Sequence, residues 1–202
     1  MNIHSYIMAR TIDNTKLEGI KLNAIKLIVE KGYGGASISS IAKKAKVAEG
    51  YLYRFYKSKE ELVSDLLNSK ISEIADNLEE SIQKSDSFAK IIELLVHGIF
   101  VMAEKSSNDI KFLYVMMNDY SFSISSTIKE RIALLCNELN KKGKSLNQIE
   151  ESISDEEIYM FLVIYPIQFI NLRFKKFFGN SKWTAGDIER VIAICSKSLK
   201  SN

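Results

Sequence analysis

The stretch from Gly32 to Leu62 decides the fold, and it reads GYGGASISSIAKKAKVAEGYLYRFYKSKEEL. Ser37 is a good N-cap residue, because its hydroxyl can accept a hydrogen bond from a free backbone amide at the start of a helix. Four apolar residues then recur at helical spacing on one face: Ile38, Ile41, Ala42 and Ala45. Residues 46–48 leave room only for a tight turn, so a second short helix is expected over residues 48–56.

The second short helix has one apolar and one polar face. Leu52 and Phe55 are expected to point inward, which leaves Gly50, Tyr53 and Arg54 on the outside. Two short helices joined by a tight turn match the helix-turn-helix, whose second helix enters the major groove of DNA. The Arg54 side chain can make paired hydrogen bonds to a guanine edge.

Other side chains around this motif are candidates for DNA contacts as well. We include Ser37, Ser39, Glu49, Tyr51 and Tyr56, since hydroxyls and tyrosine rings can meet phosphates and thymine methyl groups. A third helix should begin directly afterwards, because Ser58 and Glu61 stand at capping-box spacing. Lys59, at the positive end of that helix, can hold a DNA phosphate.

This block resembles the TetR family of bacterial transcriptional regulators. The matching features are Ala24, Gly32-Tyr33, Ile41-Ala42, Leu52-Tyr53-Arg54-Phe55 and Ser58-Lys59-Glu60, within roughly residues 16–66. The chain departs from the family pattern at Lys46, Ala48 and Tyr51, where glycine, a small hydroxyl residue and threonine are common. The resemblance implies an all-α, TetR-like fold of about nine helices. It also implies a three-helix DNA-binding domain at residues 12–60 and a helical ligand-binding and dimerisation domain at residues 61–202.

Composition agrees with an all-helical protein that binds an acidic partner. The 202 residues are 46% hydrophobic and include one proline, which favours long helices with few breaks. Residues 1–60 hold 11 Lys and Arg against 5 Asp and Glu, whereas residues 61–202 hold 17 against 20. Positive charge therefore collects around the helix-turn-helix.

Apolar periodicity and capping residues place the other helices. The expected ranges are about 15–31, 58–83, 88–105, 109–120, 123–142, 154–178 and 184–199. Ser154 with Glu157, and Thr184 with Asp187, are the capping pairs that open the last two.

The last two long helices are expected to form a homodimer. Both carry broad apolar faces, although these faces must also close the monomer's own core. The resemblance implies that two copies pair through this region into a four-helix bundle. There is also a physical reason to expect a dimer, because two recognition helices about 34 Å apart can read a palindromic double-stranded operator.

A small-molecule pocket is expected in the second domain. Its candidate residues combine large apolar faces with a few polar tips, as binding pockets do: His97, Phe100, Phe112, Met116, Tyr120, Tyr159, Gln168 and Arg173. The alternative is that they form ordinary core. If Arg173 is buried, it needs an acidic ligand or a carboxylate partner. Pro166 removes one backbone donor and is expected to kink its helix.

Catalysis, cofactors and metals are not expected. The chain has two histidines, and no nucleophile, phosphate-loop or metal-binding motif is recognisable. Cys136 and Cys195 lack metal or redox spacing and are expected to be core residues. Residues 1–10 lack the features of a signal peptide, and the apolar stretch Tyr159–Ile170 is too short to span a membrane. A cytoplasmic protein is therefore expected.

These observations together predict a DNA-binding transcriptional regulator. We expect a repressor that a small, mostly apolar ligand releases from a palindromic operator, by shifting the helix over residues 58–83. The alternative is a TetR-like architectural or division-control DNA binder without a small-molecule effector.

Overall fold

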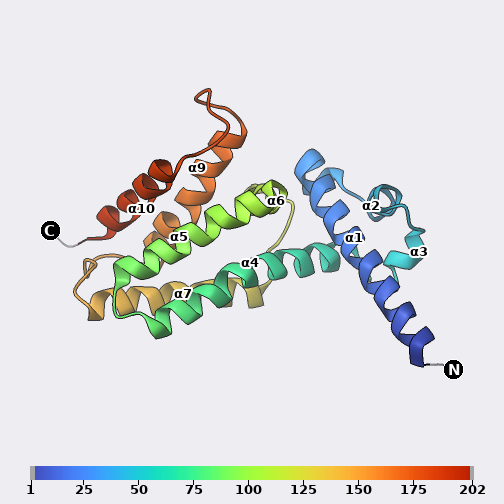
Figure 1. Ribbon diagram of the computed structural model, residues 1–202, viewed down its shortest axis with the longest axis horizontal. Helices are drawn as coiled ribbons and strands as arrows, with labels where there is room; N and C mark the ends of the chain where they lie inside the picture. Colours follow the sequence, from blue (N-terminus) through green and yellow to red (C-terminus); the bar gives the residue numbers. More distant parts are fainter. Residues whose placement is uncertain (1–2, 201–202) are drawn as a thin grey trace. The chain divides into compact units, whose positions relative to one another are not determined.

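The computed structural model describes the backbone of residues 3–200 and the side chains of residues 14–200, and this part of the chain is all-helical (Figure 1). The elements are α1 (Ile3–Gly35), α2 (Ile38–Ala45), α3 (Glu49–Leu52), α4 (Lys59–Lys84), α5 (Phe88–Lys105), α6 (Ser107–Asn118), α7 (Ser126–Ser145), α8 (Asp155–Tyr159), η1 (Met160–Ile164), α9 (Tyr165–Phe174) and α10 (Ala185–Leu199). Because α8, η1 and α9 follow without a break, residues 3–200 form nine continuous helical segments. The predicted all-α fold of about nine helices is confirmed.

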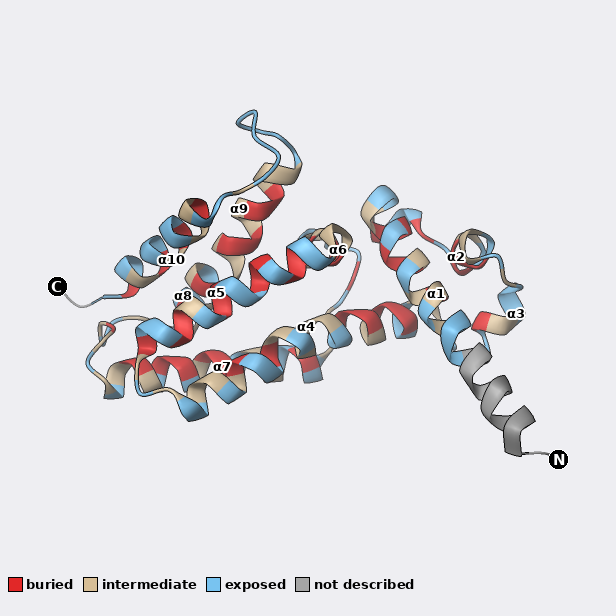
Figure 2. Cartoon of the chain, viewed as in Figure 1, coloured by how far each residue is buried: buried red, intermediate tan, exposed pale blue. Residues whose placement is uncertain are grey.

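Burial follows the expected amphipathic pattern, with buried residues recurring along one side of the longer helices (Figure 2). In α5, nine residues are buried, including Phe88, Ile92 and Phe100, and this helix contacts both α9 and α10. None of the described helices is both long and apolar enough to cross a bilayer.

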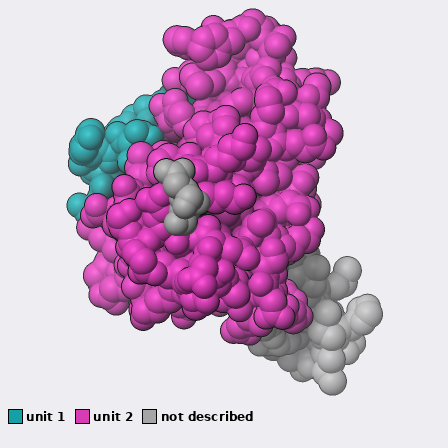
Figure 3. Space-filling view, turned by 90° about the vertical axis from the view of Figure 1, so that its left-hand side faces the viewer, with its two compact units in different colours: residues 1–67, 115–123 teal, residues 68–114, 124–202 magenta. Residues whose placement is uncertain are grey.

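The chain divides into two compact units (Figure 3). Unit 1 comprises residues 1–67 and 115–123, and unit 2 comprises residues 68–114 and 124–202. The helix α4 supplies residues to both units, since it runs from Lys59 to Lys84 across the division. The first unit thus includes more of α4 than the domain predicted at residues 12–60.

Unit 1 is built around α1. The predicted inward residues Ile20, Ala24 and Leu27 are buried, while Leu17 is half-buried. The helix begins earlier than the predicted residue 15 and is interrupted at Gly32, where the backbone is left-handed with φ 73°. Only glycine adopts this conformation readily, so the glycine stops the regular helix where the sequence predicted its end.

Ion pairs fix α4 to its neighbours within unit 2. Arg131 on α7 donates to Ser72 Oγ and Asp76 Oδ1, each at 2.6 Å, and to Glu79 Oε1 at 3.3 Å. On α6, Asp109 is buried, and its carboxylate lies 2.8 Å from the Lys70 ammonium. These contacts hold α4 from Lys70 onward against both α6 and α7.

The long helical segment before α10 contains a π-helical turn, η1, directly before Pro166. Proline has no amide hydrogen to donate back along the helix, so a carbonyl one turn earlier needs another donor. The Cys195 thiol on α10 supplies it, because its sulfur lies 3.0 Å from the Phe161 carbonyl oxygen. Cys136 and Cys195 are both buried, as the sequence predicted.

Candidate DNA-binding surface and effector groove

Local hydrogen bonds fix both ends of α2, the first helix of the helix-turn-helix. At its start, the Ser40 amide donates to Ser37 Oγ at 3.1 Å, and the Ser37 amide donates to Ser40 Oγ at 2.9 Å. This reciprocal pair satisfies two amides for which the helix has no partner. At its end, Lys46 is left-handed with φ 56°, and the Val47 amide donates to the Ala42 carbonyl at 3.0 Å. The resulting turn directs the chain into α3.

The recognition segment comprises residues 48–56, which were predicted to form one helix. Its regular helical part is shorter than predicted. Only Glu49–Leu52 is α-helical, although the Phe55 and Tyr56 amides still donate to the Leu52 carbonyl at 2.9 and 3.0 Å. Ala48 precedes the helix and provides no side-chain cap. A hydroxyl or carboxamide at that position would satisfy a first-turn amide, so its absence fits a short helix.

The predicted outer face of this segment is accessible to solvent. Leu52 is buried and Phe55 half-buried, whereas Tyr53 is 53% exposed. Six of the residues predicted to contact DNA are exposed: Ser37, Ser39, Glu49, Gly50, Tyr53 and Arg54. The apolar side of the segment thus anchors it, and its polar side faces outward.

Aromatic and cationic groups gather around Tyr51, which is half-buried. Its ring packs edge-on against Phe55 with 5.3 Å between centroids, and the Arg54 guanidinium lies 5.3 Å from its centroid. The Lys16 ammonium of α1 lies 5.7 Å from the same ring. Sequence reasoning missed Lys16 as a neighbour of the recognition segment, because only the fold brings α1 to it.

Tyr56 is placed differently from the prediction that it faces DNA. Its side chain is only 7% exposed, and its hydroxyl donates to Asp65 Oδ2 on α4 at 2.7 Å. Burial, followed by this hydrogen bond, raises the pKa of Tyr56 above its ordinary value. Asp65 also pairs with Lys21 of α1 at 3.1 Å. Tyr56 therefore joins α3 to α4 and does not offer its hydroxyl to a phosphate.

Lys59 is likewise engaged within unit 1. Its ammonium donates to the Tyr33 carbonyl at 3.1 Å and lies 3.9 Å from the Tyr33 ring centroid. The Tyr33 hydroxyl donates to Glu60 Oε1 at 2.8 Å, and the Tyr33 amide to Asp119 Oδ2 at 3.1 Å. The Gly-Tyr corner is thus held by the start of α4, and Lys59 would have to leave this contact to bind a phosphate.

The expected capping pair at the start of α4 is formed in a modified way. The Glu61 amide donates to Ser58 Oγ at 3.1 Å, as predicted. The Glu61 carboxylate accepts from the Lys57 amide at 2.6 Å, one residue before the amide that a standard capping box uses. This pair still fixes where α4 begins.

The residues predicted to line a ligand pocket do not converge on one site. Phe100, Phe112 and Met116 are almost completely buried, and the Phe100 ring packs on Trp183 with 5.4 Å between centroids. Tyr120, by contrast, is fully exposed. His97 is exposed, whereas Tyr159 and Gln168 are half-buried, and Met116 and Tyr120 belong to unit 1. Three of the eight predicted residues are therefore core, three are half-buried and two lie at the surface.

Arg173 has the carboxylate partner that its burial requires. Its guanidinium donates to Asp187 Oδ1 at 2.8 Å and lies 5.1 Å from the Phe169 ring centroid. Asp187 is buried, and its carboxylate also accepts from the Thr184 amide at 2.8 Å, completing the predicted capping pair of α10. The hydrogen bonds to Thr184 help lower the pKa of Asp187. Arg173 is thus neutralised internally and needs no acidic ligand.

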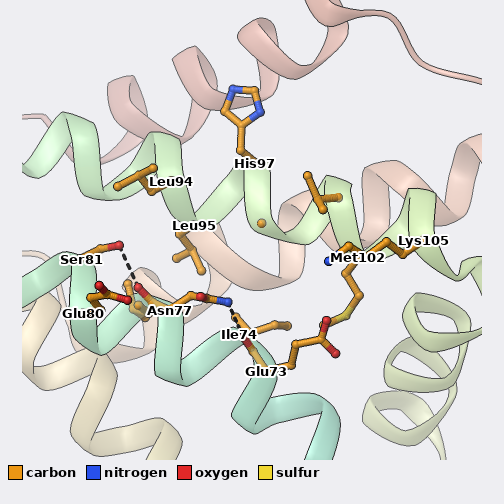
Figure 4. Close-up of a pocket in the computed structure, with 13 residues that line it drawn as sticks. Glu73, Ile74, Asn77, Glu80, Ser81, Leu94, Leu95, His97, Met102 and Lys105 are labelled. Atoms are coloured by element: carbon orange, nitrogen blue, oxygen red, sulfur yellow. Dashed lines mark hydrogen bonds between the residues drawn. The ribbon is translucent and has the colours of Figure 1, made fainter.

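A groove lies elsewhere in unit 2, between the second half of α4 and the middle of α5 (Figure 4). Its volume is about 330 Å³, within the range of small-molecule sites. Among the predicted pocket residues, only His97 lines it. Tyr159 instead lines a second depression of about 540 Å³ between α7 and α8, together with Cys136 and Met160.

Comparison with known proteins gives the same assignment for the N-terminal segment. Residues 23–66 match the family described as bacterial regulatory proteins of the tetR family. The HTH-type transcriptional regulator YvdT of Bacillus subtilis is 26% identical over 142 residues, which is 70% of this chain and 73% of that protein. The matched proteins are transcriptional regulators and not enzymes.

Solved structures share the fold over nearly the whole chain. A TetR family transcription regulator from Marinobacter aquaeolei VT8 superposes with a TM-score of 0.78 at 15% identity, covering 96% of this chain and all of that one. The transcriptional regulator FadR of Bacillus subtilis, solved in complex with stearoyl-CoA, superposes with a TM-score of 0.66 at 18% identity. That match covers 91% of this chain and 99% of FadR.

Proposed function

We propose that this chain, which belongs to the TetR family of bacterial regulators, is a cytoplasmic repressor that binds a palindromic operator as a homodimer. The observation that carries the proposal is the recognition segment of unit 1. Gly50, Tyr53 and Arg54 are exposed there, while Leu52 and Tyr56 anchor the segment from inside. A short helix presented in this way is the part of a helix-turn-helix that enters the major groove.

The proposed roles in DNA binding follow from side-chain chemistry. Arg54 reads a guanine through paired hydrogen bonds, and Tyr53 contacts a phosphate or a thymine methyl group. Ser37, Ser39 and Glu49 are exposed as well and are proposed to contact the DNA backbone. Lys59 contributes positive charge near the backbone, provided that it leaves Tyr33 on binding. Residues 12–60 form the DNA-binding domain in this proposal.

The dimer surface is proposed on η1 and α10, in the domain formed by residues 61–202. Met160 of η1 and Ile194 of α10 are 54% and 45% exposed, so both apolar side chains are accessible to a second chain. Two chains are also needed on physical grounds, since one short recognition helix makes few base contacts.

The proposed effector is a small, mostly apolar ligand. Support comes from the similar fold of Bacillus subtilis FadR, which was solved with stearoyl-CoA. The groove on α4 favours an effector over a purely architectural DNA binder. A coupling free energy of about 1–3 kcal/mol, exerted through α4, would weaken operator binding about 5–150-fold.

Operator titrations test the proposal. The DNA upstream of the protein's own gene is titrated with wild type and with the Arg54→Ala and Arg54→Lys variants, with and without stearoyl-CoA. We expect Arg54→Ala to lose about 1–3 kcal/mol on the specific site. Arg54→Lys should keep its affinity for random DNA but lose base preference, because lysine cannot form the paired contact.

Light scattering on the same complexes measures the number of chains bound to each operator. Equal losses on specific and random DNA for both variants would show that Arg54 is not a base-reading residue. A single chain on each operator would contradict the dimer. An operator affinity unchanged by stearoyl-CoA would exclude that ligand as the effector.

A further inference from the structure

The groove between α4 and α5 has an apolar floor and polar ends (Figure 4). Ile74 and Leu78 of α4 line it opposite Leu95 and Met102 of α5. The walls on α5 are formed by Leu94 and Val101, which remain 44% and 43% exposed. Large apolar side chains that line a concave surface and stay exposed are typical of a binding site.

Gly98 is a lining residue of this groove that contributes no side chain to it. It lies in the interior of α5, between Leu94 and Val101 on the same helix face, and a β-carbon added to it would meet no atom within 4 Å. Neither close packing nor a left-handed backbone therefore requires glycine at this position. Glycine in a helix interior is unfavourable relative to alanine. Its effect here is to leave space along the groove.

The charges around the groove favour an anionic ligand group at one end. Glu73 and Glu80 both line the groove. Glu80 pairs with Lys84 at 2.5 Å, and Glu73 lies 3.7 Å from Lys70, whose nearer partner is Asp109 at 2.8 Å. Lys105, at the C-terminal end of α5, lines the groove and makes no ion pair with any described residue. Among the charged lining residues, the one that forms no ion pair with any described residue is thus a cation.

The polar groups of α4 in the groove are already bonded to their own helix. The Asn77 amide donates to the Glu73 carbonyl at 2.7 Å, and the Ser81 hydroxyl donates to the Asn77 carbonyl at 2.8 Å. These groups therefore need no hydrogen-bond partner from a ligand in the middle of the groove, so a hydrocarbon chain can lie beside them.

We propose that this groove is the effector site and that it binds an acyl chain carrying an anionic head group. The chain lies over Gly98, between Leu94 and Val101, and the head group pairs with Lys105. The inference rests on the proposed ligand-released regulator and names its site and ligand class. A ligand in the groove touches α4 directly, and α4 carries residues of both units.

Variants of Gly98, Glu138 and Lys105 and two ligand probes test this site. Gly98→Phe fills the groove, Gly98→Ala leaves it open, and Glu138→Phe adds the same ring to an exposed position of α7 outside it. Binding of dodecanoate and dodecanoyl-CoA is measured by calorimetry, with CoA alone as the reference. Helical content and ligand-free operator binding establish that each variant folds.

We expect wild type, Gly98→Ala and Glu138→Phe to bind alike and Gly98→Phe to bind at least tenfold more weakly. Lys105→Ala should weaken binding severalfold, and Lys105→Arg should restore it. Binding of dodecanoate shows that the carboxylate suffices, whereas binding of dodecanoyl-CoA alone assigns the head group to the CoA phosphates.

Other outcomes would overturn the assignment. If Gly98→Phe binds both probes as wild type does and is still released from the operator, the ligand-released repressor stands but the groove is not its site. If the wild type binds neither probe, the ligand class is wrong while operator binding is unaffected. If Gly98→Phe changes only the mass of the protein in solution, the groove is a contact between copies.

Discussion

The segment after α2 in unit 1 and the ion-paired helices of unit 2 differ in how accessible their polar side chains are. In unit 1, the segment with Gly50, Tyr53 and Arg54 presents polar groups to the outside of the molecule. In unit 2, by contrast, Arg131 and Arg173 are held by carboxylates of neighbouring helices. A surface that reads DNA, as proposed for unit 1, needs groups that another molecule can reach, whereas a scaffold around a ligand, as proposed for unit 2, needs groups that fix its helices. Whether a side chain is accessible to another molecule, and not its residue type, therefore distinguishes a residue that contacts a partner from one that stabilises the fold.

The largest expected effect is on the free energy of unfolding, and it distinguishes two aromatic residues that were predicted to line one pocket. Phe112 of unit 2 is fully buried and Tyr120 of unit 1 is fully exposed. Phe112→Ala should lower the free energy of unfolding by about 3–5 kcal/mol, because it removes buried area and leaves a cavity. Tyr120→Ala should change it by no more than about 0.5 kcal/mol. Denaturant unfolding measures both, and similar values for the two variants would contradict the difference in burial.

An intermediate effect comes from the buried tyrosines of unit 1. Burial raises the pKa of Tyr33 to about 12, and burial with the Asp65 hydrogen bond raises the pKa of Tyr56 as well. Both pKa values are higher folded than unfolded, so their stabilising contribution is complete below pH 10 and is lost as the pH rises through the folded values.

The Tyr56→Phe variant isolates this contribution. Above pH 10, the free energy of unfolding of the wild type should fall more steeply than that of the variant, by up to about 1.4 kcal/mol per pH unit. Denaturant unfolding at a series of pH values from 9 to 11 provides the comparison. Parallel pH profiles would show that the Tyr56 hydroxyl ionises as freely in the folded protein as in the unfolded chain.

The smallest expected changes in the free energy of unfolding come from two opposite substitutions, one in each unit. Lys46 is left-handed with φ 56°, a conformation that favours glycine. Gly98 is helical with open space around its missing side chain. Lys46→Gly and Gly98→Ala should each raise the free energy of unfolding by roughly 0.5–1 kcal/mol. Thermal unfolding measures both, and a destabilised Gly98→Ala would mean that some group packs against this glycine.

Elements fixed by neighbours in sequence could be predicted. Ser37, Ser154 and Thr184 cap their helices as the sequence predicted, because a cap needs only residues within the same turn. Leu52 was correctly placed inside, since helical spacing alone determines which face it shares. The predicted contacts with DNA remain predictions.

Contacts that depend on the meeting of distant segments could not be predicted. Tyr56 was wrongly expected to face DNA, because the position of Asp65 depends on the angle between α3 and α4. Phe100 packs on Trp183, which lies 83 residues away in sequence, and no local pattern indicates such a pair. The groove did leave one signal in the sequence, namely a glycine in the middle of an apolar helix.

The thiol of Cys195 gives the protein an internal reporter of its own motion. The residue is fully covered, its hydrogen is committed to the Phe161 carbonyl, and burial raises its pKa to about 12. The thiolate is the form that attacks an alkylating reagent, and both ionisation of this buried thiol and access of the reagent require α10 to detach from η1. The alkylation rate of Cys195 therefore measures how often α10 separates from η1, and the measurement requires no introduced label.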